Sequence, residues 1–261
     1  MTPRVLIIAG SDSSGGAGIQ ADIKTVTMLG GYAATAVTAV TVQNTLGVSA
    51  VHAIPAEVVA AQMRAVIGDI GVDAVKIGML GDADVIAAVA EVLRGLKVPI
   101  VLDPVMVAKG GASLLADDAV EALVRYLLPL STIVTPNTPE LAVLTGTEVD
   151  DEGDAVLAAQ ELLGLGARAV LAKGGHLAGE EVTDWLVTAN GQTRFVSRRI
   201  DTRHTHGTGC TLASAIAVGL GRAEPLAEAV AAARAYVFGA IEHAPGFGAG
   251  HGPLGHGWML T

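Results

Sequence analysis

The sequence predicts an α/β fold with a mainly parallel β-sheet, and three observations lead to this prediction. Short apolar runs alternate with helical patterns along most of the chain. Strands and helices that alternate at this spacing form βαβ units with right-handed crossovers. Of the 261 residues, 51% are hydrophobic but only 3% are aromatic, so small and branched side chains build the core. Such residues suit parallel strands buried between close-packed helices.

Predicted strands and helices alternate through the first half of the chain. The strands are Val5–Ala9, Ala34–Val42, Ala74–Ile77 and Ile100–Leu102. The helices are Ala17–Leu29, Pro55–Ile67, Ala83–Leu93 and Asp117–Leu127. Gly30 and Gly31 end the first helix, because glycine readily adopts the left-handed conformation found after helix C-termini. Pro55 starts the second helix, since its fixed φ suits a first helical turn.

The second half continues this alternation and then changes. Two more strands, Thr132–Val134 and Arg168–Ala172, alternate with helices at Thr138–Leu144 and Asp154–Leu163. Val182–Thr188 and Thr193–Val196 flank Asn190-Gly191, a strong signal for a β-hairpin. Two helices follow Gly207, and no linker or repeat interrupts the chain. We therefore expect residues 1–261 to form a single domain.

Composition and charge exclude several classes of protein. The net charge of −10 is unsuited to a surface that binds nucleic acid or an anionic membrane. A polyphosphate ligand would therefore need backbone N–H groups, a few placed cations or a metal. The single cysteine excludes an intrachain disulfide and any Cys-based zinc site. The apolar runs are too short for a signal peptide or a membrane span, so we expect a cytoplasmic protein.

The segment His206–Thr211 runs directly into an apolar helical pattern. Gly207 and Gly209 let the backbone turn tightly, so that successive N–H groups can point at one place. The positive end of the helix dipole adds to them, which makes an anion site without Lys or Arg. Cys210 would lie in the first helical turn, an arrangement that suits phosphoryl transfer to a hydroxyl group. A glycine-rich turn around a small buried cysteine is an equally good interpretation of this segment alone.

Polar residues also follow the first two predicted strands. The loop Gly10–Gly18 opens a helix, but no acidic residue occurs between Asp22 and Glu57, which argues against a dinucleotide-binding fingerprint. The loop is therefore predicted to approach a ligand closely, with Asp22 one helical turn further on. Gln43 ends the second strand with an amide donor and acceptor side by side, able to pair with a ring nitrogen and its neighbouring amine. Ordinary exposed polar roles remain open for both side chains.

Three charged residues follow later strands. Asp103 comes directly after an apolar run, and Glu140 lies in a turn that starts a helix. Carboxylates at neighbouring strand ends could hold Mg²⁺ through its waters. Lys173 ends another strand, where one mobile cation could meet a phosphate chain. As alternatives, Asp103 could cap the turn before Pro104, Glu140 could be a first-turn helix acid, and Lys173 could be a surface lysine.

Together these motifs resemble the hydroxymethylpyrimidine/phosphomethylpyrimidine kinases of the ribokinase-like superfamily, over essentially the whole chain. The motifs are Ala9–Asp22, Thr41–Thr45, Asp103–Met106, Thr135–Glu140, Lys173–His176 and His206–Thr211. The resemblance implies a three-layer α/β/α sandwich with a small β-hairpin, in which helices cover both faces of a mostly parallel sheet of about eight strands. It also implies ATP- and Mg²⁺-dependent phosphorylation of 4-amino-5-hydroxymethyl-2-methylpyrimidine and then of its monophosphate in thiamine biosynthesis, by a homodimer.

The resemblance assigns a role to individual residues by their place in these motifs. Gln43 pairs with the aminopyrimidine edge and Met79 covers the ring. The residues expected at the pyrimidine are Gly10, Asp22, Val42, Gln43 and Met79. Those expected at the nucleotide phosphates are Asn137, Lys173, Thr208 and Gly209, and those expected at the metal are Asp103 and Glu140. The catalytic group is Cys210 with Gly207, Thr208, Gly209 and Lys173.

Cys210 stands where sugar kinases of the superfamily carry an aspartate base. A thiol at a helix N-terminus is expected to have a lowered pKa, and a loose phosphoryl-transfer transition state asks little of a base. Cys210 could therefore be a base or only part of the anion site. A cysteine nucleophile paired with His206 is the rival chemistry, although no third residue is evident to orient the histidine.

Two other functions remain open from the sequence. A pyridoxal or pyridoxine kinase on the same scaffold also acts on a hydroxymethyl heteroaromatic ring, but Gln43 favours an aminopyrimidine over a phenolic pyridine. A non-catalytic vitamin-binding protein could dispense with Cys210 or the metal carboxylates, which this chain keeps. The sequence departs from the family pattern at Ser13, where proline is common, and at Lys109-Gly110-Gly111.

Overall fold

Eight strands form the central sheet, in the order β10-β9-β8-β7-β6-β5-β1-β2. The computed structural model describes residues 1–106 and 117–260, so Lys109-Gly110-Gly111 lies outside the described residues. The strands are β1 (Arg4–Ala9), β2 (Tyr32–Val37), β5 (Ala74–Ile77), β6 (Ile100–Leu102), β7 (Ile133–Val134), β8 (Ala169–Lys173), β9 (Glu181–Thr188) and β10 (Gly191–Arg198). In this spatial order, all neighbouring strands from β8 through β7, β6, β5 and β1 to β2 pair in parallel. Strand β9 is antiparallel to both of its neighbours, β8 and β10. The predicted mostly parallel sheet is confirmed.

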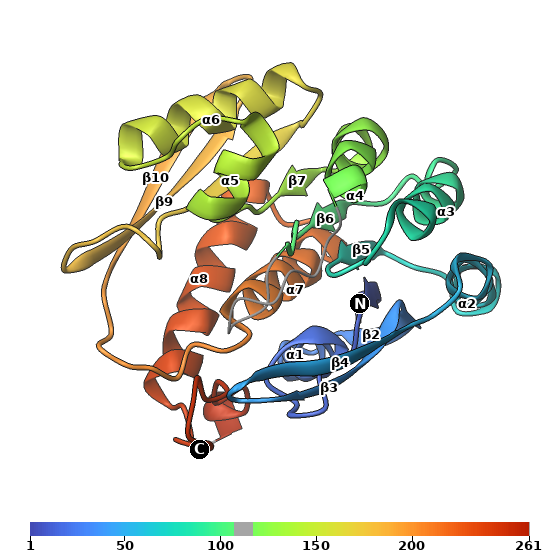
Figure 1. The fold of residues 1–261 in the computed structure, drawn as a ribbon, viewed down its shortest axis with the longest axis horizontal. Coiled ribbons are helices and arrows are strands. Elements are labelled where there is room, and N and C mark those ends of the chain that lie inside the picture. Colours follow the sequence, from blue (N-terminus) through green and yellow to red (C-terminus); the bar gives the residue numbers. More distant parts are fainter. Residues whose placement is uncertain (107–116, 261) are drawn as a thin grey trace.

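Helices cover both faces of this sheet (Figure 1). One layer contains α1 (Gly18–Met28), α7 (Thr208–Gly221) and α8 (Leu226–Glu242); the other contains α2 (Ala56–Asp69), α3 (Ala83–Leu93), α4 (Asp117–Ala122), α5 (Thr138–Thr145) and α6 (Glu152–Gly164). Successive side chains of a strand point to opposite faces. In β1, Val5 and Ile7 therefore enter one core, and Leu6 and Ile8 enter the other. The three-layer α/β/α prediction holds.

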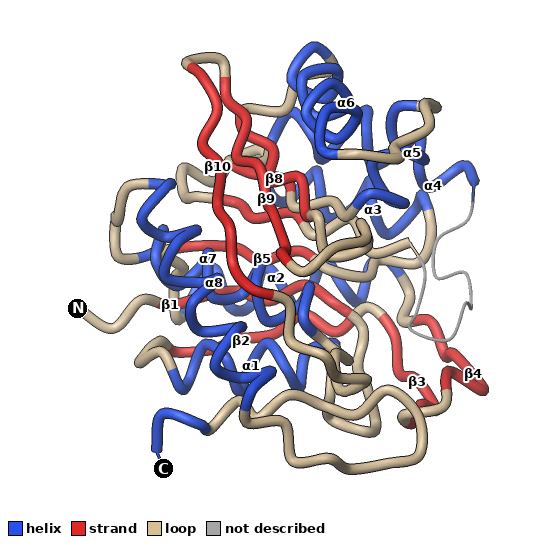
Figure 2. The backbone as a smooth tube through the Cα atoms, turned by 90° about the vertical axis from the view of Figure 1, so that its left-hand side faces the viewer, coloured by secondary structure: helices blue, strands red, loops and turns tan. Residues whose placement is uncertain are grey.

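The prediction of one strand from Ala34 to Val42 is wrong. The main sheet keeps β2 only to Val37, and β3 (Ala39–Asn44) pairs antiparallel with β4 (Gly47–Ala53) in a separate two-stranded sheet. Figure 2 shows this small sheet standing apart from the main one. The chain changes sheets at Thr38, whose hydroxyl donates to the Met79 carbonyl at 2.7 Å. An unbroken run of Ala, Thr and Val with no glycine or proline gives no sign of such a change.

The predicted hairpin near Asn190 is confirmed, with its turn one residue earlier. Thr188 pairs with Gly191, so Ala189 and Asn190 form the two-residue turn. This hairpin extends the edge of the main sheet, and the small separate hairpin is β3–β4. Among the described residues, none of the helices combines the length and hydropathy that crossing a membrane requires.

Candidate active site

A cavity of about 990 Å³ opens at the carboxyl ends of the parallel strands, where ligands bind in open α/β sheets. Its walls come from the loop after β1, from β3, from the ends of β6 and β8, and from the start of α7. Most of the residues predicted for the site line it, namely Gly10, Gln43, Met79, Asp103, Asn137, Glu140, Lys173, Gly207, Thr208, Gly209 and Cys210. Asp22 and Val42 are not among the lining residues.

The start of α7 has the geometry of an anion site. Gly207 precedes the helix with φ of +87°, in the left-handed region that favours glycine. A Cβ atom there would also lie 1.9 Å from the Gly16 carbonyl oxygen, so only glycine lets the two loops meet. The Thr208 N–H donates to the Thr205 carbonyl at 3.4 Å. The next two first-turn N–H groups, those of Gly209 and Cys210, have no partner four residues earlier within the helix. They are positioned to bind an anion at the positive end of the helix dipole.

Two carboxylates and an ammonium group lie beside this anion site. Lys173 Nζ lies 3.0 Å from Asp103 Oδ1 and 3.9 Å from Glu140 Oε2. A Cβ on Gly209 would lie 3.3 Å from Asp103 Oδ2 and 3.4 Å from Lys173 Nζ, so this pair is close to the helix start. Asn137 caps α5, since its side chain accepts from the Glu140 N–H while Glu140 accepts from the Asn137 N–H. The cap holds Glu140 towards Lys173.

The pKa values of this cluster reflect two buried acids that share one cation. Burial and the nearby Asp103 charge raise the pKa of Glu140 to about 7, although Lys173 opposes them. Burial alone would lower the pKa of Lys173, but Asp103 and Glu140 raise it. Lys173 is therefore charged at neutral pH. Its single positive charge faces two carboxyl groups, so the site can accept a further cation.

These carboxylates fit a Mg²⁺ ion that keeps most of its waters. Asp103 and Glu140 are 2% and 8% exposed at the edge of the cavity. Over the described ranges, no cluster of three or more His, Cys, Asp or Glu side chains could enclose a metal. Magnesium typically takes one or two carboxylates together with substrate phosphates and water, which is what this donor set offers.

The expectation of a lowered pKa for Cys210 is wrong. The loss of hydration on burial raises the pKa of the thiol to about 11, and the negative charges of Asp22 and Asp103 add to this effect. Lys76 and a hydrogen bond from the Gly18 N–H act in the opposite direction but do not outweigh it. The helix dipole that suggested a reactive thiolate is therefore outweighed by burial, and the thiol is protonated at neutral pH.

Asp22 and Val42 lie away from the cavity that the sequence analysis assigned them to. Asp22 is fully buried, where it accepts from Lys76 Nζ at 2.8 Å and from Ser214 Oγ at 2.7 Å. The carboxylate thus joins α1 to β5 and α7 beneath the cavity floor. Val42 is 59% exposed and points to the outer side of β3. Lys76, the fully buried charged partner, was missed, although a lysine within a short apolar strand is itself a signal of a buried ion pair.

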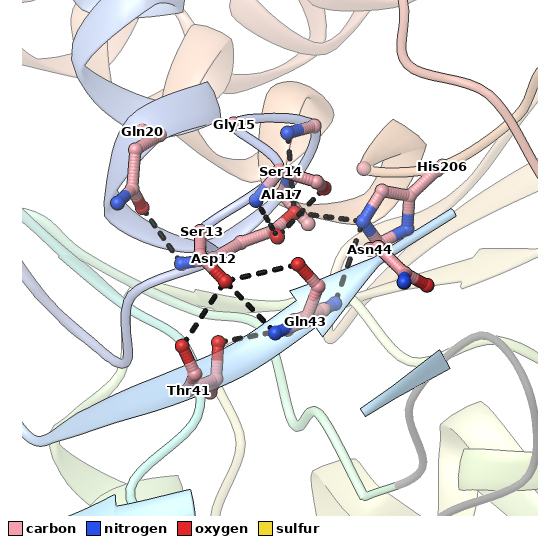
Figure 3. A network of polar contacts seen from close by, with 12 residues as sticks. Asp12, Ser13, Ser14, Gly15, Ala17, Gln20, Thr41, Gln43, Asn44 and His206 are labelled. Atoms are coloured by element: carbon pink, nitrogen blue, oxygen red, sulfur yellow. Dashed lines mark hydrogen bonds and ion pairs between the residues drawn. The ribbon is translucent and has the colours of Figure 1, made fainter. Parts of the chain in front are cut away.

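Gln43 is held at the cavity wall by a β-bulge and by the loop after β1 (Figure 3). The register of β3 against β4 shifts between Val42 and Gln43, which re-aims the Gln43 side chain. Ser13 Oγ accepts from the Gln43 N–H at 2.8 Å and lies 2.9 Å from the Gln43 carbonyl oxygen. Ser13, which stands where proline is common in the family, therefore holds the bulge in place.

Asp12 and His206 were missed as a pair by the sequence analysis. His206 Nε2 lies 2.8 Å from Asp12 Oδ2, and both side chains are buried. Asp12 also accepts from backbone N–H groups of its own loop, the behaviour of an Asx turn. Asp followed by two serines and two glycines could have revealed that turn. Asp12 could orient His206, but the His206 ring contacts Asp12 and Gln43 through Nε2, and burial raises the pKa of the Cys210 thiol. The interpretation of His206 as the partner of a nucleophilic Cys210 therefore gains no support.

Comparisons with known proteins agree with this geometry. The family model described as phosphomethylpyrimidine kinase matches residues 12–255. A hydroxymethylpyrimidine/phosphomethylpyrimidine kinase of Streptomyces coelicolor is 51% identical over 258 residues, which covers 99% of this chain and 96% of that protein.

Solved structures of two kinases share the fold. An ADP complex of Bacillus subtilis pyridoxal kinase has a TM-score of 0.92 and 36% identity, and the match covers 100% of this chain and 99% of that one. A phosphomethylpyrimidine kinase of Clostridium difficile has a TM-score of 0.81 and 41% identity, over 91% of this chain and 98% of that one. The family model spans most of the chain, and the Streptomyces coelicolor kinase matches over nearly the whole length of both proteins. The chain therefore belongs to the phosphomethylpyrimidine kinase family.

Proposed function

We propose that this protein transfers the γ-phosphoryl group of ATP to the hydroxyl of 4-amino-5-hydroxymethyl-2-methylpyrimidine, and then a second one to the monophosphate, in thiamine biosynthesis. One observation carries the proposal. The Gly207–Cys210 anion site, the Lys173–Asp103 pair and the Gln43 amide all face a single cavity. An anion site beside an amide that can read an aminopyrimidine edge is what such a kinase needs.

Positioning and charge neutralisation supply most of the catalysis, because phosphoryl transfer passes through a loose transition state. The N–H groups of Gly209 and Cys210 would stabilise negative charge on the transferred group. Lys173, charged and fixed by two carboxylates, would contact the phosphate chain. A Mg²⁺ ion at Asp103 and Glu140 would neutralise charge on the phosphate oxygens. The Cys210 thiol would lie at the reacting hydroxyl.

The nucleotide base has an apolar place to bind in the same cavity. Leu212 of α7 and Val237, Phe238 and Ile241 of α8 line it. The B. subtilis relative was solved as an ADP complex. We propose that ATP lies with its base against this surface and its phosphates directed towards Lys173 and the start of α7.

Pyridoxal is the second candidate substrate, since a pyridoxal kinase shares the fold at a TM-score of 0.92. Fold similarity alone does not choose the ring. Gln43 offers a donor and an acceptor to a ring nitrogen and an adjacent amine, and pyridoxal has no such amine. The 51% identity to a hydroxymethylpyrimidine/phosphomethylpyrimidine kinase points the same way.

Two variants test this assignment through separate kinetic constants. Cys210→Ala should lower kcat by about 100-fold or more while the Kd for the pyrimidine changes little, because in this proposal the thiol would lie only at the reacting hydroxyl. Gln43→Ala should chiefly raise KM for the pyrimidine. Turnover near the wild-type value in Cys210→Ala would remove the thiol from the mechanism, and an unchanged KM in Gln43→Ala would reject the amide contact. Val42→Ala, one residue away on the outer side of β3, serves as the matched control.

Several properties rest on the sequence and the family alone. We propose that the protein is a cytoplasmic homodimer and that residues 1–261 fold as one domain. Neither nucleic acid nor a membrane is expected as a partner, given the net charge of −10.

A further inference from the structure

The Asp12 carboxylate is held in place by five hydrogen bonds. It accepts from the Ser14 N–H and hydroxyl, from the N–H groups of Gly16 and Ala17, and from His206, at 2.7 to 3.1 Å. Burial would raise the pKa of Asp12, but the hydrogen bonds from His206, Ser14 and Ala17 outweigh it and lower the pKa to about 2. Asp12 is therefore a carboxylate at neutral pH, and a carboxylate only accepts hydrogen bonds.

The Asp12 carboxylate determines which imidazole nitrogen of His206 carries a hydrogen. His206 Nε2 lies 2.8 Å from Asp12 Oδ2, so Nε2 must carry a hydrogen and donate it. In the structure the same Nε2 lies 3.4 Å from the amide nitrogen, Nε2, of Gln43 (Figure 3). A nitrogen that already donates cannot accept from the amide NH₂. The amide group that suits this position is its oxygen, which can share the imidazole hydrogen.

The contacts of Thr41 independently indicate the same orientation of the Gln43 amide. The Thr41 hydroxyl lies 2.9 Å from the Ser11 carbonyl oxygen and 3.1 Å from Gln43 Oε1, as the amide is placed in the structure. A hydroxyl has one hydrogen, and the Ser11 carbonyl can only accept it. The amide end that faces Thr41 must then donate, which makes it the NH₂ group. Oxygen and nitrogen of an amide are assigned from such partners, and these partners require the reverse of the placement in the structure, in which Nε2 faces His206 and Oε1 faces Thr41.

We propose that the Asp12–His206 pair holds the Gln43 amide with its oxygen towards His206 and its NH₂ towards Thr41, and so decides which way round the aminopyrimidine ring binds. This inference rests on the proposed function for its substrate. The amide oxygen accepts from the ring amine, and the second NH₂ hydrogen is donated to the adjacent ring nitrogen.

The orientation brings the reacting group to the anion site. On the proposed substrate, the amine and the hydroxymethyl group are on neighbouring carbons. His206 immediately precedes Gly207, so an amine at the His206 end of the amide places the hydroxymethyl group on the side of Gly207 and Cys210. The opposite amide orientation would turn the ring over and direct the hydroxymethyl group away from that side. His206 is thus a positioning residue.

The first test examines the free enzyme and needs no substrate. The ¹⁵N-imidazole NMR spectrum of the protein labelled at histidine should show a protonated Nε2 for His206, with the resonance identified by its absence in His206→Gln. An unprotonated Nε2 at neutral pH would overturn the proposal, because that atom would then accept from the amide.

The second test uses two pyrimidines, one with the amine and one with hydrogen in its place. His206→Leu frees the amide to turn, so Kd for the amino compound should rise about tenfold, while Kd for the compound without the amine changes less than about threefold. His206→Gln keeps an N–H donor towards Asp12 and should restore binding. Thermal unfolding of each variant establishes that it is folded.

The outcomes separate the two hypotheses. Equal losses for both pyrimidines in His206→Leu, or no rescue in His206→Gln, would show that His206 has only a structural role and would overturn the inference. If the wild-type enzyme bound neither pyrimidine, the proposed function would fail and the ring orientation with it, whereas the NMR result would still decide the orientation of the amide.

Discussion

The Cys210 thiol faces the cavity from the first turn of α7, yet it is not poised as a thiolate. Its surroundings raise its pKa to about 11, chiefly through burial. A base works best when its pKa lies near the working pH. If Cys210 accepts the substrate's proton, its own proton must leave first. The N–H groups of the same helical turn need no such step, so the anion site is the firmer part of the mechanism.

Alkylation of Cys210 tests this at the level of one atom. Because only the thiolate reacts, iodoacetamide should label the native enzyme slowly at pH 8, and the rate should rise tenfold per pH unit until about pH 11. The same cysteine in denaturant, with its ordinary pKa, serves as the reference, and mass spectrometry follows the adduct. Rapid labelling that levels off near pH 7 would show a lowered pKa and restore the expectation drawn from the sequence.

Most residues of the site could be placed from the sequence because they occupy strand ends and glycine-rich turns. Gln43, Asp103 and Lys173 follow strands, and parallel strands bring such positions to one edge of the sheet. Asp22 could not be placed, because helical spacing does not reveal that its face is closed by Lys76 and α7. The pKa of Cys210 depends on burial, which no local pattern encodes.

Among the elements, the C-terminal segment fastens the loops that form the site. The His251 N–H donates to the Thr45 carbonyl in the β3–β4 turn at 2.9 Å, and the His206 N–H donates to the Gly252 carbonyl at 3.1 Å. Further on, His256 Nε2 lies 3.0 Å from the Thr211 hydroxyl of α7. The segment therefore joins the small sheet to the anion-site helix (Figure 1).

The buried His256 predicts how stability depends on pH. Burial, with a smaller effect of Lys24, lowers its pKa to about 4, whereas the unfolded value is 6.5. Below pH 6.5 the unfolded chain therefore binds a proton that the native protein does not bind until pH 4, so stability is lost as pH falls. Between pH 6.5 and pH 5 we expect His256 to account for a loss of about 2 kcal/mol.

Urea unfolding at these two pH values measures the effect. His256→Gln keeps an N–H donor towards Thr211 but does not titrate, so its free energy of unfolding should fall less between pH 6.5 and pH 5. His243→Gln, at an exposed histidine, is the matched control. Equal pH dependence in His256→Gln and the wild type would contradict the buried neutral imidazole.

The sheet and its two helical layers were predictable because their periods are strong, whereas the β3–β4 hairpin was not. Val48 to Ala53 in β4 are mostly exposed, so no buried face marks the strand. The change of sheets at Thr38 depends on its contact with Met79, a residue 41 positions away. Local patterns can reveal periodicity but not such distant contacts.

Across the whole molecule, the β3–β4 hairpin presents apolar side chains that the main core does not cover. Val40 and Val42, which lie on one face of β3, are 49% and 59% exposed, and Leu46 in the turn is 69% exposed. Such a patch is typical of an interface, and the proposed homodimer would bury it. Sedimentation should give twice the 26.3 kDa of one chain. Leu46→Asp should shift the protein towards monomer, while Leu157→Asp on α6, similarly exposed at 64%, should not. A wild-type monomer at micromolar concentration would contradict the dimer.

The central claim concerns the substrate, and product masses test it most directly. The purified protein is given Mg-ATP with hydroxymethylpyrimidine or with pyridoxal, and ADP release and product masses are recorded. We predict a pyrimidine monophosphate followed by the diphosphate, with little product from pyridoxal. A clear preference for pyridoxal would keep the phosphate machinery but contradict the role of Gln43, and no ADP release with either ring would contradict the kinase assignment itself.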